Sequence, residues 1–119
     1  MKAAIFIRDL HDGPFKDGRK HQALYRLTEP MTYPVFDEDC LEREEVVWHV
    51  MVSAVDWYRF HETYIYPADE SGPVGLCQLD GSECGIFDHE RALSNAGYTI
   101  VRSAHELAAF YAITRSAAE

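Results

Sequence analysis

The feature that most constrains the fold is a valine-rich run at residues 45–55, EVVWHVMVSAV. Side chains branched at the β carbon, like aromatic ones, fit the pleated surface of a strand better than the crowded surface of a helix. Apolar residues recur on both faces of this run, since Trp48 and Val50 share one face and Met51 lies on the other. Periodicity alone also allows a buried helix, but the density of valine favours a strand. We therefore predict an interior strand at residues 45–55.

Neighbouring segments supply candidate partners for this strand. The sequence HETYIY at residues 61–66 predicts a second strand, antiparallel to the first. Near the N-terminus, residues 3–7 and 22–28 predict two more strands, joined by the turn-rich stretch 11–18. Residues 29–45 hold prolines and many acids, so we expect a solvated loop or at most one helical turn there.

Helix signals are confined to the last third of the chain. Asp88 is a good N-cap for a helix at residues 89–96, which a glycine follows. Residues 98–102 then suit a short strand. Ser103 opens an S-x-x-E capping box for a final helix at residues 104–115.

Together these elements predict one α+β domain over residues 1–119. Its expected architecture is a small, mostly antiparallel sheet with one or two helices packed on one face. Residues 1–20 are a candidate peripheral hairpin or arm. A chain of 119 residues with 47% hydrophobic residues is long enough to bury a core and too apolar to be disordered.

The charge is large and unevenly distributed. The net charge is −9, and no lysine follows Lys20. Residues 1–34 carry six Lys or Arg against four Asp or Glu, whereas residues 35–119 carry five Arg against sixteen acids. An acidic surface repels phosphate backbones, so we expect no nucleic acid to bind the body of the domain. Solubility alone would also explain the acidity.

The cysteines and the hydropathy of the chain indicate in which cellular compartment we expect the protein. Cys40, Cys77 and Cys84 are an odd number of thiols in a chain that can fold without disulfides, which favours a reducing cytoplasm. The apolar stretch at residues 46–55 is about half as long as a membrane helix. The apolar run at the N-terminus meets Arg8 too early for a secretory signal. We therefore expect a cytoplasmic protein that does not bind membranes.

Two motifs that suggest chemistry fail on inspection. His61 and Glu62 resemble the start of the zinc-protease motif H-E-x-x-H, but residue 65 is Ile where the second histidine is needed. Residues 81–85, GSECG, have the glycines of a nucleophile elbow, but Glu83 stands at the position of the serine. We therefore predict no catalytic residues.

Three residues are weak candidates for a zinc site: Cys77, Cys84 and His89. Structural zinc sites usually hold two thiolates in a close C-x-x-C pair, and this sequence has none. Core packing for Cys77 and a loop position for Cys84 are the simpler interpretation. We therefore expect neither a bound metal nor a cofactor.

Two features suggest an interface with another protein. Residues 37–45 hold six acids and one arginine beside the apolar strand. An aromatic series follows that strand, and aromatic residues are enriched at interface centres, although packing within the sheet is the commoner reason for them. The candidate interface residues are Glu42, Glu44, Glu45, Trp57, Tyr58, Tyr64 and Tyr66.

Part of the chain resembles a group of uncharacterised proteins. Residues 62–69 (ETYIYPAD), 79–82 (LDGS) and 88–98 (DHERALSNAGY) are similar to small proteins encoded by phages of actinobacteria. The resemblance covers residues 53–98 and carries over no functional residue. It implies a bacterial cytoplasm during infection or lysogeny as the setting.

In that setting we predict a non-enzymatic module that binds a host or defence protein with a basic surface. The alternatives are a small metal-dependent enzyme and a minor virion or assembly component. The chain is also a candidate for self-association.

Overall fold

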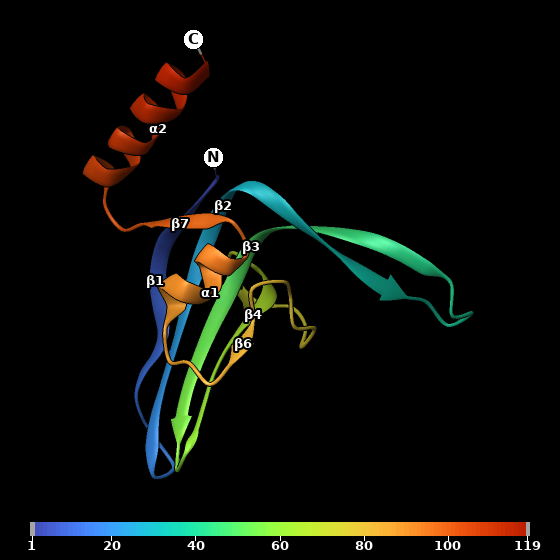
Figure 1. Ribbon diagram of the computed structural model, residues 1–119. Coiled ribbons are helices and arrows are strands. Elements are labelled where there is room, and N and C mark those ends of the chain that lie inside the picture. Colours follow the sequence, from blue (N-terminus) through green and yellow to red (C-terminus); the bar gives the residue numbers. More distant parts are fainter. Residues whose placement is uncertain (1, 119) are drawn as a thin grey trace.

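The computed structural model describes residues 2–118 of the chain, and the side chains of residues 2–115. Four long strands follow one another as antiparallel neighbours (Figure 1). They are β1 (Lys2–Phe15), β2 (Gly18–Phe36), β3 (Glu42–Trp57) and β4 (Phe60–Asp69). Three short strands complete the sheet: β5 (Gly72–Pro73), β6 (Glu83–Cys84) and β7 (Tyr98–Val101).

This seven-stranded mixed sheet corrects the predicted fold class. The strands dominate the chain, whereas we expected a small sheet with helices packed on one face. Its order is β5-β4-β3-β2-β1-β7, with β6 also paired to β4. Strand β7 runs parallel to β1, which makes the sheet mixed. The prediction failed because it ended strands at turn-forming residues that the structure places inside or beside longer strands.

The interior strand at residues 45–55 is confirmed, as is its antiparallel pairing with residues 61–66. Val50 and Val52 are fully buried on the face that helix α1 (His89–Asn95) covers, where Leu93 of that helix packs. Met51 points to the opposite face and packs with Leu24 of β2. The strand is therefore apolar on both faces because each face has its own core.

The N-terminal hairpin exists, but its turn is much shorter than predicted. Residues 11–15 are strand, and only Lys16 and Asp17 connect β1 to β2. Lys16 adopts a positive φ of 53°, which a two-residue hairpin turn commonly requires. Gly18 follows because a Cβ there would lie 1.7 Å from the carbonyl oxygen of Asp56 in β3. This close approach places the hairpin turn beside β3, so residues 2–20 are part of the sheet and not a peripheral arm.

The arm of this protein lies elsewhere, in the segment that we expected to be a loop. Beyond an irregularity in β2 between Arg26 and Met31, β2 and β3 continue as a two-stranded ribbon away from the sheet (Figure 1). We call residues 32–46 the arm. Pro34 is tolerated in the arm because each strand there has a free edge, and proline in sheets is confined to such edge strands.

Both helices begin where the sequence predicted. The carboxylate of Asp88 accepts a hydrogen bond from the Arg91 amide at 3.1 Å and caps α1. The Ser103 hydroxyl oxygen accepts one from the Glu106 amide, also at 3.1 Å, and caps α2 (Ala104–Ala118). Helix α2 starts at the edge of the sheet (Figure 1), and its Phe110 packs with Ala3 of β1 and Val101 of β7. Neither helix has the length and apolar character needed to cross a membrane.

Candidate functional site

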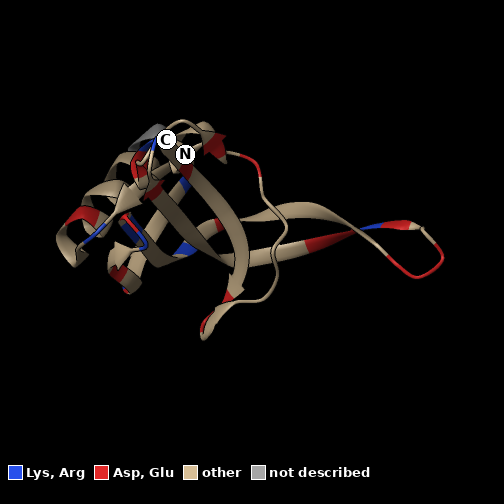
Figure 2. Ribbon diagram, turned by 90° about the horizontal axis from the view of Figure 1, so that it is seen from below, with Lys and Arg blue, Asp and Glu red and all other residues tan. Residues whose placement is uncertain are grey.

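The arm exposes apolar side chains that a folded domain normally buries. Phe36 is 65% exposed, Leu41 64% and Val46 57%, and Trp48 at the base of the arm is 52% exposed. Six acids lie among them, which Figure 2 shows in red toward the end of the arm. The connecting loop is ordered by Asp37, whose carboxylate accepts hydrogen bonds from the amides of Asp39 and Leu41, each at 2.9 Å.

The pairing of the two strands divides the arm into two faces. Phe36 pairs with Glu42, Pro34 with Glu44, and Thr32 with Val46, so these six residues share one face. Tyr33 pairs with Glu45, and Val35 with Arg43, on the other face. Arg43 also forms an ion pair with Glu45 at 3.1 Å. The structure therefore groups Glu42 and Glu44 with exposed apolar residues and places Glu45 on the opposite face.

The aromatic members of the predicted interface lie at the other end of the sheet. Tyr58 forms the turn between β3 and β4 and is 68% exposed, and its ring centroid lies 5.1 Å from that of Trp57. Tyr64 and Tyr66 are half-buried on β4, in an edge-to-face pair with centroids 6.3 Å apart. The β3–β4 turn and the end of the arm point in different directions (Figure 1). The structure therefore does not join the predicted aromatic and acidic residues into one surface.

Sequence reasoning missed the apolar residues of the arm. The signal was present, because residues 31–36, MTYPVF, hold the aromatic and branched residues that strands favour. Pro34 and the following acids led us to expect a loop instead.

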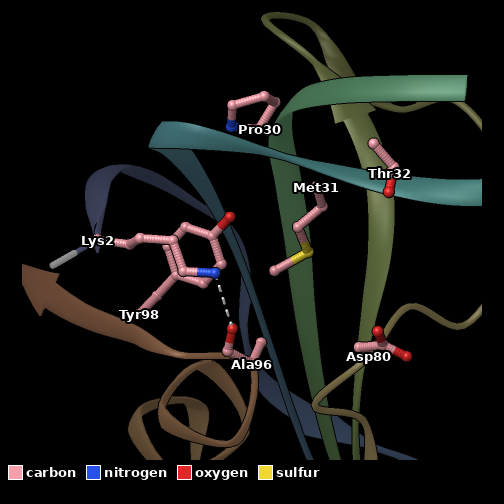
Figure 3. A pocket seen from close by; sticks show the side chains of 7 residues that line it. All are labelled: Lys2, Pro30, Met31, Thr32, Asp80, Ala96 and Tyr98. Carbon is pink, nitrogen blue, oxygen red and sulfur yellow. Dashed lines mark hydrogen bonds between the residues drawn. The ribbon is translucent and has the colours of Figure 1, made fainter.

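A small cavity lies at the base of the arm, between β2, β7 and the end of α1 (Figure 3). Its volume is about 200 Å³, and the Lys2 ammonium enters it 4.5 Å from the centroid of the Tyr98 ring. That ammonium donates to the carbonyl oxygen of Ala96 at 3.4 Å, and the Tyr98 hydroxyl donates to the carbonyl oxygen of Glu29 at 2.7 Å. Burial raises the pKa of Tyr98, so its hydroxyl stays neutral. The Lys2 ammonium and the Tyr98 hydroxyl are therefore both engaged with backbone carbonyl oxygens.

The candidate zinc ligands are not brought together. His89 is buried on the sheet side of α1, whereas Cys77 and Cys84 are exposed. The Cys84 sulfur lies 3.1 Å from the Tyr64 hydroxyl. Within the described residues, these three do not form a cluster with metal-binding spacing.

His89 instead has a structural role. Its Nε2 lies 2.8 Å from the carbonyl oxygen of His21, which can only accept, so Nε2 carries the hydrogen. Its Nδ1 then accepts a hydrogen bond from the Tyr25 hydroxyl at 3.0 Å. Burial lowers the pKa of His89 to about 4 and raises that of Tyr25 to about 12. Both groups are therefore neutral at neutral pH and tie α1 to β2.

No protein-family model, curated protein or solved structure matches this chain.

Proposed function

We propose that this chain is a non-enzymatic module that docks onto another protein through its arm. The observation that supports this most strongly is the exposure of Phe36 and Val46 on the same face as Glu42 and Glu44. Apolar side chains that stay exposed contribute no burial to the stability of the arm. Their removal from water on binding would contribute roughly 25 cal/mol per Å² of apolar surface.

The mixture of charge and apolar surface indicates the chemistry of the partner. Acids steer a protein toward basic surfaces and speed association, whereas apolar side chains at the centre of a contact slow dissociation. The partner that fits the arm is a protein with an apolar groove bordered by Lys and Arg. Phe36 would enter the groove, and Glu42 and Glu44 would face its basic border.

The proposed setting rests on the resemblance to phage-encoded proteins. It is the reducing cytoplasm of a bacterium, where the partner would be a host or defence protein. The three exposed thiols are compatible with that compartment.

Site-specific photo-crosslinking tests the docking surface directly. A photoreactive amino acid replaces Val46 in one variant and Leu76, which is 85% exposed outside the arm, in the control. We expect the first variant to trap one specific protein from bacterial lysate, and the control not to trap it. Equal trapping at both positions, or none at Val46, would contradict docking through the arm.

Charge reversal then tests the mechanism with the purified partner. We expect Glu42→Lys with Glu44→Lys to slow association about ten-fold at low salt, and the difference to shrink as salt screens the charges. The matched control reverses two exposed acids outside the arm, Asp17→Lys with Glu70→Lys, and should associate like the wild type. If both double variants associate equally fast, the acids of the arm serve only solubility.

A further inference from the structure

A second cluster of chemically capable side chains lies on the sheet face that α1 covers, and it is independent of the arm. Asp9 and Asp12 of β1 and His21 of β2 each direct one potential ligand atom to the same point, and these atoms lie within 4.8 Å of one another. A carboxylate oxygen of Asp9 is 2.7 Å from Nε2 of His21. Among the described residues, this is the one group of His, Cys, Asp and Glu that meets such spacing.

A break in strand regularity creates this cluster. Residues three apart in a regular strand point to opposite faces, so Asp9 and Asp12 would be separated by the sheet. The register of β1 against β2 shifts between Asp9 and His11, which brings Asp9 to the face of Asp12 and His21. Bulges of this kind re-aim side chains and are frequent beside functional sites.

The imidazole of the cluster is held in place from behind. The His21 ring stacks on the buried His89 ring, with centroids 4.2 Å apart and planes 12° apart. His89 also donates to the His21 carbonyl oxygen, which fixes the backbone of this residue. These two contacts limit how far the ring and backbone of His21 can move.

The charges of the cluster are only partly compensated. Asp9 and Asp12 are both about half-exposed, and the nearest cation to Asp12 is Arg19, whose Nη2 lies 3.6 Å from the carboxylate. Arg19 is itself 63% exposed, so this surface ion pair is weak and readily exchanged. Two neighbouring carboxylates repel each other. A divalent ion in place of Arg19 would offset the repulsion between Asp9 and Asp12 more fully than the single charge of the arginine does.

The geometry points to a divalent transition-metal site formed by Asp9, Asp12 and His21. A tetrahedral zinc ion with bonds of about 2.1 Å keeps its ligand atoms about 3.4 Å apart. The present spacing reaches this value by small rotations of two exposed carboxylates. The imidazole nitrogen suits Zn²⁺ better than Ca²⁺ or Mg²⁺, which prefer oxygen alone, and the two carboxylates also suit Mn²⁺. Three protein ligands also leave positions open for water or another ligand.

Titration with two metals tests the site in the full chain. Zn²⁺ is titrated by calorimetry, and Mn²⁺ by its paramagnetic broadening of amide resonances. Mn²⁺ avoids thiolates, so the exposed cysteines do not compete for it. We expect one strong Zn²⁺ site per chain, and Mn²⁺ broadening at Asp9, Asp12, His21 and the neighbouring His89.

The variants Asp12→Asn and His21→Gln should each weaken Zn²⁺ binding at least ten-fold. The control is His61→Gln, because His61 pairs with Asp56 at 3.1 Å in a similar exposed pair that lacks a third ligand. This control should leave binding unchanged. Circular dichroism without metal verifies that each variant is folded, and Mn²⁺ broadening in the wild type needs no variant. Broadening absent from Asp9, Asp12 and His21, or equal Zn²⁺ affinity in the ligand and control variants, would overturn the assignment.

Discussion

The arm and the body of the sheet share strands β2 and β3. The body buries most apolar side chains of these strands, whereas the arm leaves several of them exposed. Val52 in the body of β3 is 0% exposed, whereas Val46, six residues earlier in the same strand, is 57% exposed. Around Val52 the sheet has neighbours on both edges and α1 on one face. Around Val46 there is only the partner strand β2.

This difference shows that two strands can pair without burying their apolar side chains. Strand pairing needs only two segments with suitable side chains and a turn between them, and the arm has both. Burial needs a second layer, and within the described residues no helix covers the outer part of the arm (Figure 1). Tyr33, near the base of the arm, does pack against the main core. The acids of the arm protect its free edges, because charged side chains discourage pairing with further strands.

Removal of the covering layer should have the largest effect on stability. Leu93 is fully buried between α1 and the sheet, so Leu93→Ala should lower the free energy of unfolding by about 3 kcal/mol. Leu41→Ala, in the exposed loop of the arm, should change it by less than about 0.5 kcal/mol. Urea unfolding followed by tryptophan fluorescence measures both variants. Similar losses would show that the arm has a core of its own.

Acid should weaken the attachment of α1 to β2. The pKa of His89 falls from 6.5 to about 4 on folding, so its contribution is fully present above pH 6.5 and is lost as the pH falls through about 4. The shift corresponds to roughly 3 kcal/mol. Urea unfolding in chelator-containing buffer should show the stability difference between wild type and His89→Gln shrinking from pH 7 to pH 4.

The control for this titration is His105→Gln, because His105 is exposed on α2. This variant should follow the wild type at every pH. A difference between wild type and His89→Gln that stays constant with pH would mean that His89 does not titrate as its burial requires.

The smallest effect should come from the arm itself. Val46→Ala should change the free energy of unfolding by less than about 0.5 kcal/mol, while Val52→Ala in the same strand should lower it by about 2 kcal/mol. Urea unfolding of the two variants compares the same substitution with and without a covering layer. A loss above 1 kcal/mol for Val46→Ala would mean that the arm supports the body of the sheet.

Local chemistry explains the elements that sequence reasoning predicted correctly. Valine density predicted the interior strand, and Asp88 and Ser103 predicted the starts of both helices. In each case the signal and the structure lie within a few residues of one another. The arm was missed because Pro34 and the acids resemble a loop, although its two strands are neighbours in the chain and pair across residues 37–41.

The candidate sites depended more on the tertiary structure. Glu42 and Glu44 were identified from the sequence, but their apolar neighbours Phe36 and Val46 were not. Asp9, Asp12 and His21 were missed altogether, because the regular alternation of a strand places the two aspartates on opposite faces. The bulge between Asp9 and His11 puts both on the same face. His89 was considered as a metal ligand, yet its burial against Tyr25 makes it structural.

The sequence by itself therefore determined the interior strand and the starts of both helices, because propensity and capping act over a few residues. The tertiary structure decided how far the strands extend, that β7 lies parallel to β1, and which apolar side chains stay exposed. These properties depend on contacts between residues far apart in the chain. No local pattern reveals whether a strand with apolar residues will receive a covering layer, and in this protein that layer separates the body from the arm.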